Sequence, residues 1–179
     1  MDPAAIWTIG HSTRPLEAFI DLLRGSQIAL VADVRRYPAS RMHPHFNAAL
    51  LAASLGAAGM RYEGFADLGG RRVPRPGSVN TRWRNASFRG YADYMQTVEF
   101  DGALTRLLAA AEGARTAIMC AEAPWWRCHR ALIADALKAR GIEVMHIMGL
   151  GKSVAHSYTS AASVVDGNLC YGPAPGLFG

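Results

Sequence analysis

The stretch TAIMCAEAPWWRCHR, from Thr116 to Arg130, decides the fold of this chain. Residues 116–119 are an apolar run, which is typical of a short buried strand. The last three residues, 128–130, open a helix that we expect to continue to about Arg140. The loop after a strand lies at the carboxyl edge of an α/β sheet, where ligands usually bind. We therefore expect the polar residues of this loop at a functional edge.

The rest of the chain repeats this alternation of strand and helix, which predicts a parallel sheet. We expect a single α/β domain over residues 1–179, with a Rossmann-like, mostly parallel sheet of about five strands and helices on both faces. The expected core is about residues 6–148. In the C-terminal extension, residues 149–179, an Asp-Gly pair between apolar residues predicts a hairpin. The expected strands are 6–9, 28–32, 60–63, 116–119 and 143–148, and the expected helices are 15–25, 47–58, 87–95, 101–112 and 128–140.

Several of these helices follow a side chain that can accept a hydrogen bond from a free backbone N–H. We predict caps from Ser12 or Thr13 for the first helix, from Asn47 for the second and from Ser87 for the third. Pro15 suits the first turn of the first helix.

The composition excludes several classes of protein. The chain has 179 residues, of which 50% are hydrophobic, so it can build a core and is not disordered. No apolar run is long enough to span a bilayer, and residues 1–9 lack the features of a secretory signal. The three cysteines do not make a disulfide framework. We therefore expect a cytoplasmic protein.

The net charge is +5, and nearly all of the basic residues are arginine. Residues 68–92 contain no acid but six arginines, and a segment of one sign attracts anions. Arginine suits the recognition of phosphate, so the pattern indicates a phosphate-bearing ligand or a nucleic acid. A genomic base composition that favours arginine explains the overall bias equally well.

The two cysteines of the opening stretch have several readings. Cys128 lies at a predicted helix N-terminus, where free N–H groups stabilise a thiolate, so it is a candidate nucleophile or metal ligand. Cys120 is a partner thiol or a core residue, and Glu122 is a base or the ion-pair partner of Arg130. The spacing of these groups matches no common zinc site, so we assign no metal. Both cysteines can also be small buried residues.

Polar groups also follow the first two predicted strands. His11 and Ser12 come after the first strand, where a turn at a helix start can hold an anion and His11 can assist proton transfer. Asp33 and Arg35 follow the second strand and form either a structural ion pair or part of the same cleft. The expected anion-binding residues are Ser12, Arg35, Arg41, His129 and Arg130, and the expected catalytic residues are Cys128, Glu122 and His11. Trp125 and Trp126 either stack on a base or anchor the loop.

An ordered set of short motifs runs through the chain. It comprises Thr8-Ile9-Gly10-His11-Ser12, Asp33-Val34-Arg35 with Pro38, Ser40 and Arg41, Leu68-Gly69-Gly70, Tyr91-Ala92 with Met95, Cys120-x-Glu122, and Cys128-His129-Arg130. Over about residues 6–168 this set resembles the family catalogued as domain of unknown function 488. That resemblance implies an α/β domain with these motifs at one edge, and it implies no particular reaction. At His156-Ser157-Tyr158 the chain departs from the proline expected between His and Tyr.

Three functions follow from these observations. The first is an enzyme that acts on a phosphate-bearing substrate, a nucleotide or a nucleic acid, at the strand carboxyl edge. The second is a non-catalytic nucleic-acid-binding module that uses the arginines of residues 68–92. The third is a metal or redox site at Cys120 and Cys128. The sequence names no cofactor and no oligomeric state.

Overall fold

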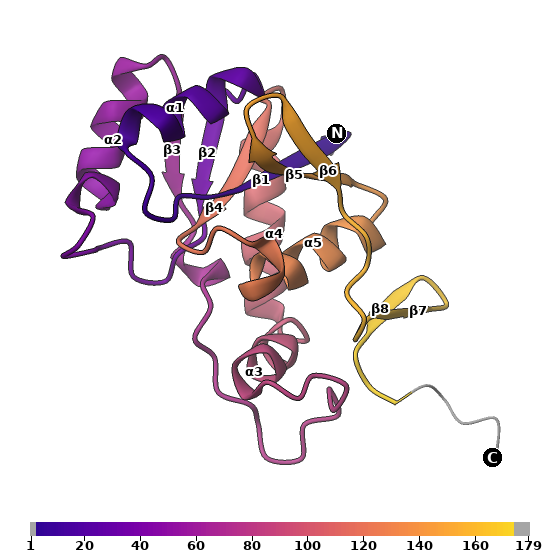
Figure 1. The fold of residues 1–179 in the computed structure, drawn as a ribbon. Helices are drawn as coiled ribbons and strands as arrows, with labels where there is room; N and C mark the ends of the chain where they lie inside the picture. The colour runs from indigo at the N-terminus through magenta and orange to yellow at the C-terminus, as the bar shows by residue number, and fades with distance from the viewer. Residues whose placement is uncertain (1–2, 174–179) are drawn as a thin grey trace.

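The computed structural model describes residues 3–173, which form a mixed α/β domain around one six-stranded sheet (Figure 1). The strand order is β3-β2-β4-β1-β5-β6, in which β6 alone is antiparallel to its neighbour. The predicted α/β class and mostly parallel sheet are thereby confirmed. The elements are β1 (Ala5–Gly10), α1 (Leu16–Gly25), β2 (Leu30–Asp33), α2 (Ala48–Ala57), β3 (Arg61–Gly64), α3 (Ala86–Tyr94), α4 (Val98–Ala111), β4 (Thr116–Cys120), α5 (Arg130–Ala139), β5 (Glu143–Gly149), β6 (Lys152–Ala155), β7 (Ser163–Val165) and β8 (Asn168–Cys170).

Helices cover both faces of the sheet (Figure 1). On one face, apolar side chains of α1 and α2, such as Phe19 and Leu55, pack against Ile9 and Val31 of the sheet. On the other face, α4 and α5 pack against residues such as Ile118. Every residue of β2 and of β4 is buried, because these strands lie inside the sheet and are covered on both sides.

The structure adds one strand to the sheet. β6 pairs with β5 and lies within the expected C-terminal extension rather than the expected core. Its four residues are all exposed, so the strand shows neither the apolar run nor the alternating pattern by which a strand is predicted from sequence. The helix α4 begins at Val98, three residues before the predicted start, because Thr97 caps it by accepting a hydrogen bond from the N–H of Phe100.

The predicted helix caps are wrong in three cases. The residue before α1 is Pro15, and no side chain caps that helix. Asn47 does precede α2, but its side-chain oxygen accepts a hydrogen bond from the N–H of Ser40 instead of capping the helix. The cap of α3 is Asn85, which accepts from the N–H of Phe88, and Ser87 lies inside the helix. For Asn47 the competing donor is the N–H of Ser40.

The C-terminal hairpin is confirmed. Strands β7 and β8 pair antiparallel around Asp166 and Gly167, whose φ angles are 50° and 79°, as a tight two-residue turn requires. Residues 174–179 of the expected extension lie outside the described part of the chain. Within residues 3–173, no helix combines the length and apolar character needed to cross a membrane.

Candidate active site

The carboxyl ends of β1, β2 and β4 lie side by side, and the loops that follow them meet. In the sheet, Gly10 is paired with Cys120, and Asp33 is paired with Met119. The first residue after β1 is tied to β4, because the His11 N–H donates to the carbonyl of Cys120. Together these loops, with parts of residues 70–91, enclose a cavity of about 650 Å³. The expected site residues that line it are His11, Ser12, Arg35, Cys120, Glu122, Cys128 and His129.

Gly10 allows this meeting of the loops. A Cβ atom at Gly10 would lie 1.8 Å from the carbonyl oxygen of Glu122 and 2.9 Å from the Cα of Ala123. No side chain fits there, so the glycine lets the loop after β4 cross directly over the end of β1.

Two thiols form the floor of the cavity. The sulfur atoms of Cys120 and Cys128 lie 2.8 Å apart, and both residues are nearly inaccessible. Cys120 ends β4. Cys128 has an extended backbone and stands two residues before the first residue of α5, so the prediction that it opens the helix is wrong by two residues. Cys128 and its neighbour His129 both precede the first residue of α5, and both line the cavity.

Arg130 lies behind the thiols rather than in the cavity. Its Nε donates to Cys120 Sγ at 3.0 Å and to Cys128 Sγ at 3.2 Å. Its other nitrogens donate to the carbonyls of Glu122 and Ala123 and to the hydroxyl of Thr8. The side chain is buried, and these acceptors use its donors. Arg130 therefore serves the thiols and the loop, and it is not among the residues that line the cavity.

The thiols differ in their readiness to ionise. Burial acts to raise the pKa of Cys128, but the hydrogen bond from Cys120 and the charge of Arg130 outweigh it and lower the pKa to about 6. Burial, the hydrogen bond to Cys128 and the negative charge of the Cys128 thiolate raise the pKa of Cys120 well above its ordinary value. The pair therefore shares one proton, which Cys120 donates to a Cys128 thiolate.

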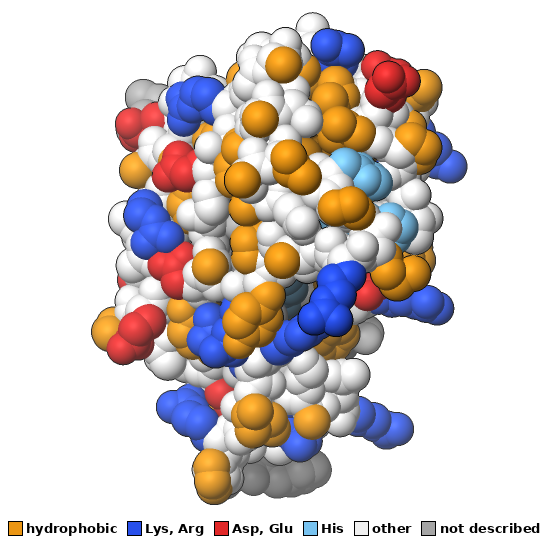
Figure 2. Space-filling view, turned by 90° about the vertical axis from the view of Figure 1, so that its left-hand side faces the viewer, with side chains coloured by type: hydrophobic (Ala, Val, Ile, Leu, Met, Phe, Trp, Pro, Cys, Tyr) orange, Lys and Arg blue, Asp and Glu red, His pale blue; other side chains and the backbone are white. Residues whose placement is uncertain are grey.

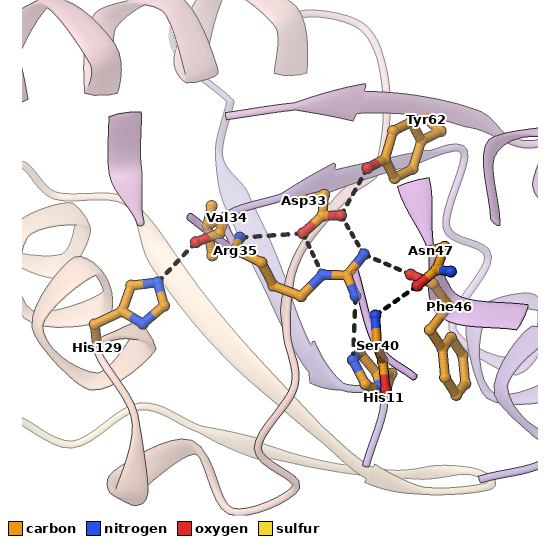
Figure 3. Close-up of polar contacts among 9 residues, drawn as sticks. All are labelled: His11, Asp33, Val34, Arg35, Ser40, Phe46, Asn47, Tyr62 and His129. Carbon is orange, nitrogen blue, oxygen red and sulfur yellow. Dashed lines mark hydrogen bonds and ion pairs between the residues drawn. The ribbon is translucent and has the colours of Figure 1, made fainter. Parts of the chain in front are cut away.

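Asp33 and Arg35 form a buried ion pair at the cavity wall (Figure 3). Arg35 donates to both carboxylate oxygens of Asp33, and Asp33 also accepts from the hydroxyl of Tyr62 at 2.6 Å. The Nη2 nitrogen of Arg35, which donates to Asp33 Oδ2, also donates to the carbonyl of Phe46. Of the two readings left open by the sequence, the structural pair describes these contacts, although Arg35 also lines the cavity.

Two of the histidines that line the cavity, His11 and His129, are neutral. His11 donates from Nδ1 to the carbonyl of Ser12 and accepts at Nε2 from Arg35, while His129 donates from Nε2 to the carbonyl of Val34 (Figure 3). Burial lowers the pKa of each to about 4. Both nitrogens of His11 are engaged, so the hydrogen bonding gives no support to proton transfer by His11, and that role stays a prediction.

Three arginines that were not among the expected anion-binding residues line the outer part of the cavity. Arg36, Arg71 and Arg127 are exposed lining residues, and the exposed ring of Tyr37 lies within 5.6 Å and 5.9 Å of the first two guanidinium groups. In Figure 2 basic side chains gather around a recess in the surface. Arg41 is exposed and is not among the lining residues, so the structure does not bring it to the others.

Several arginines of residues 68–92 hold the long loop in place instead of facing outward freely. Arg72 donates to the carbonyls of Asp67 and Gly69, and Arg82 donates to the carbonyl of Ser160. Arg75 donates to Gln96. The predicted nucleic-acid-binding module therefore has fewer free cations than the sequence indicated, and it stays a prediction.

Of the two roles that the sequence left open for the tryptophans, the structure shows loop anchoring for Trp125, and stacking on a base stays a prediction. Trp125 stacks on His146 with ring centroids 4.2 Å apart and so anchors the loop after β4. Trp126 is 52% exposed. Across residues 3–173, no three His, Cys, Asp or Glu side chains are grouped as metal ligands would be.

The fold and this site define an α/β protein with a thiol pair at the carboxyl edge of its sheet. The chain belongs to the family described as domain of unknown function DUF488, which matches residues 15–137, and the resemblance noted in the sequence is thereby confirmed. No curated protein and no solved structure is significantly similar to the chain.

Proposed function

We propose that this protein is an enzyme that uses the Cys128 thiolate as a nucleophile on an anionic, phosphate-bearing substrate. One observation carries the proposal: the sulfur of Cys128 lines the cavity and is contacted by the thiol of Cys120 and by Nε of Arg130. The backbone N–H of Arg130 also donates to this sulfur. A thiolate supported by a guanidinium and backbone N–H at a helix start is the activated form of a cysteine nucleophile.

The rim of the cavity supports an anionic substrate. Arg35 and Arg130, which the sequence suggested as anion ligands, have their donors engaged by Asp33, by the thiols and by carbonyls. We therefore assign anion binding to Arg36, Arg71 and Arg127, which line the cavity. Arginine at a cavity mouth suits phosphate, and Tyr37 offers an aromatic face beside two of these cations, as a nucleotide would need.

Glu122 is the group we assign to proton transfer. It is an exposed acid that lines the cavity two residues after Cys120. In the proposed step the Cys128 sulfur forms a bond to the electrophilic centre of the substrate. The leaving group departs with its bonding electron pair and takes a proton from the Glu122 carboxyl group. Water then attacks the thiol-linked intermediate, one proton of the water returns to Glu122, and the bond to Cys128 breaks to restore the thiolate.

The test is turnover of a panel of phosphate monoesters, phosphodiesters and nucleotides by the purified protein. Cys128→Ser abolishes turnover of any substrate found, whereas Cys170→Ser, which changes a cysteine that does not line the cavity, leaves it intact. Full activity of Cys128→Ser overturns the proposal, as does the absence of any phosphate-dependent protection of Cys128 from alkylation.

The contact between the two sulfurs favours a second candidate function, a thiol–disulfide reaction. At 2.8 Å the sulfurs of Cys120 and Cys128 lie close enough to join with little movement, giving two electrons and two protons to a disulfide substrate. Cys120→Ser separates the candidates, because it abolishes this redox reaction but leaves a measurable nucleophilic reaction at Cys128. Since all three cysteines are free, as in a reducing compartment, we place either reaction in the cytoplasm.

A further inference from the structure

Behind the thiols runs a continuous chain of buried polar side chains. The hydroxyl of Thr8 lies 2.7 Å from Nδ1 of His146, whose Nε2 lies 2.9 Å from Nδ1 of His156. Nε2 of His156 lies 2.8 Å from a carboxylate oxygen of Asp135. All four residues are at most 3% exposed. We call Thr8, His146, His156 and Asp135 the buried polar chain.

The two ends of the buried polar chain set the direction of every hydrogen bond in it. At one end, Asp135 accepts from the hydroxyls of Thr159 and Tyr171 and from the N–H of Thr159, so it acts as an acceptor. At the other end, Arg130 can only donate, and it donates to Thr8. With neutral imidazoles, each histidine then donates from Nε2 and accepts at Nδ1, so all the bonds point from Arg130 toward Asp135.

The buried polar chain touches the proposed site at two places. The hydroxyl of Thr8 accepts a hydrogen bond from Arg130, whose Nε contacts both thiols. The ring of Trp125, which lies three residues before Cys128, stacks on His146 at an interplanar angle of 2°. The buried polar chain thus contacts both Arg130, the cation beside the thiols, and Trp125, which belongs to the loop that carries Cys128.

We propose that the buried polar chain positions Arg130 against the two thiols and thereby keeps Cys128 in its ionised form, with Thr8 and His146 as positioning residues. The inference rests on the proposed function, because a thiolate matters only if Cys128 reacts. Burial, the neighbouring His156 and Arg130 lower the pKa of His146 to about 3, so the link stays neutral and intact at neutral pH. Cys120 on β4 and Tyr91 on α3 also interact electrostatically with Cys128, and further titratable or charged residues line the same cavity, among them His11, Arg35, Glu122, Arg127 and His129. The hydrogen bonds of the Thr8 side chain go to His146 and Arg130, so we expect these other groups to stay in place when Thr8 is changed.

The test compares two buried threonines of the sheet. Thr8→Val removes the acceptor of Arg130, whereas Thr116→Val removes an equally buried hydroxyl that bonds only the Ala114 carbonyl at the far end of β4. The rate of alkylation of Cys128 by iodoacetamide is measured against pH, with the site of modification read by mass spectrometry. We expect Thr8→Val to raise the midpoint by about one pH unit, which lowers the rate at pH 6 by about fivefold. Thr116→Val is expected to leave the midpoint unchanged.

Two further variants complete the test. Thr8→Ser keeps the hydroxyl and is expected to keep the wild-type midpoint, and His146→Phe keeps a ring under Trp125 but cuts the chain and is expected to raise the midpoint. An unchanged midpoint in folded Thr8→Val, shown by its circular dichroism, overturns the inference. If wild-type Cys128 instead titrates as an ordinary thiol, the proposed function fails as well, so the two failures are distinguishable without a substrate.

Discussion

At the scale of single residues, Arg130 carries a charge at a position that is 1% exposed. Removing a guanidinium from water is costly unless each of its donors finds an acceptor. Here the acceptors are two sulfurs, two carbonyls and one hydroxyl. The charge is compensated by the Cys128 thiolate, so stability and reactivity depend on the same contacts.

We therefore expect Arg130→Lys to be destabilising. A lysine ammonium cannot match the planar fork that reaches the sulfurs and the carbonyls together. Leaving the buried thiolate poorly paired is expected to lower the free energy of unfolding by about 3 kcal/mol, measured by urea unfolding. Arg36→Lys, at an exposed rim position, is the matched control and should change it by no more than about 0.5 kcal/mol. Equal stabilities of the two variants would contradict this account of Arg130.

The Asp33–Arg35 pair allows a graded test at the same scale. Asp33→Asn leaves a buried guanidinium without its counter-charge and is expected to cost about 3–5 kcal/mol. Tyr62→Phe removes only one donor to Asp33 and should cost about 1 kcal/mol. Thermal and urea unfolding of the two variants measure both effects. A Tyr62→Phe variant less stable than Asp33→Asn would show that the ion pair is not the main contributor.

At the scale of elements, the close crossing of the loop after β4 over the end of β1 makes the site. We expect Gly10→Ala to push this loop away, because the new Cβ would lie 1.8 Å from the carbonyl oxygen of Glu122. Gly102→Ala, in α4 with open space around it, should instead stabilise the protein by about 0.5–1 kcal/mol. Unfolding and Cys128 alkylation report on both variants. Normal stability and reactivity of Gly10→Ala would refute the crossing.

Much of the fold was predictable at this scale because the central parallel strands, such as β2 and β4, are apolar runs. The runs at residues 28–32 and 116–119 are visible in the sequence because β2 and β4 are buried on both faces. The exposed β6 carries no such signal. The caps could not be predicted, since whether Asn47 bonds its own helix or the N–H of Ser40 depends on how residues 36–46 fold back.

Part of the candidate site was also predictable from the sequence, and part was not. The loops after parallel strands share one edge of the sheet, and this rule predicted that His11, Arg35 and Cys128 lie close together. These three residues do line one cavity. That the donors of Arg35 and Arg130 are engaged within the protein was not predictable, because the sequence does not show which way the loops after β2 and β4 turn these side chains. The buried polar chain was not predicted either, because Thr8 and His146 are 138 residues apart and no local sequence pattern connects them.

At the scale of the whole molecule, buried neutral histidines make stability depend on pH. Burial lowers the pKa of His11 and His129 to about 4 and that of His146 to about 3. As the pH falls below about 6.5, the unfolded chain binds protons that the folded chain does not, so the histidine contribution is complete above pH 6.5 and is lost toward pH 4.

We expect the melting temperature to fall between pH 6.5 and pH 5, before most carboxylates titrate. The measurement is best made on Cys128→Ser, because the lowered pKa of Cys128 adds a separate loss of stability as the pH falls from about 9 to 6. Calorimetry at constant ionic strength gives the slope. A melting temperature that is equal at pH 6.5 and pH 5 would show that these histidines do not stay neutral in the fold.

The central claim is that three strand ends meet around a cavity in which Cys128 is a thiolate at neutral pH. The most direct measurement is the pH profile of iodoacetamide alkylation of the wild-type protein, with each cysteine followed by mass spectrometry. We predict that Cys128 is alkylated first, with a midpoint at about pH 6, and that Cys120 and Cys170 are alkylated more slowly. A midpoint near pH 9 for Cys128, or modification of Cys170 while Cys128 stays unmodified, would contradict the claim.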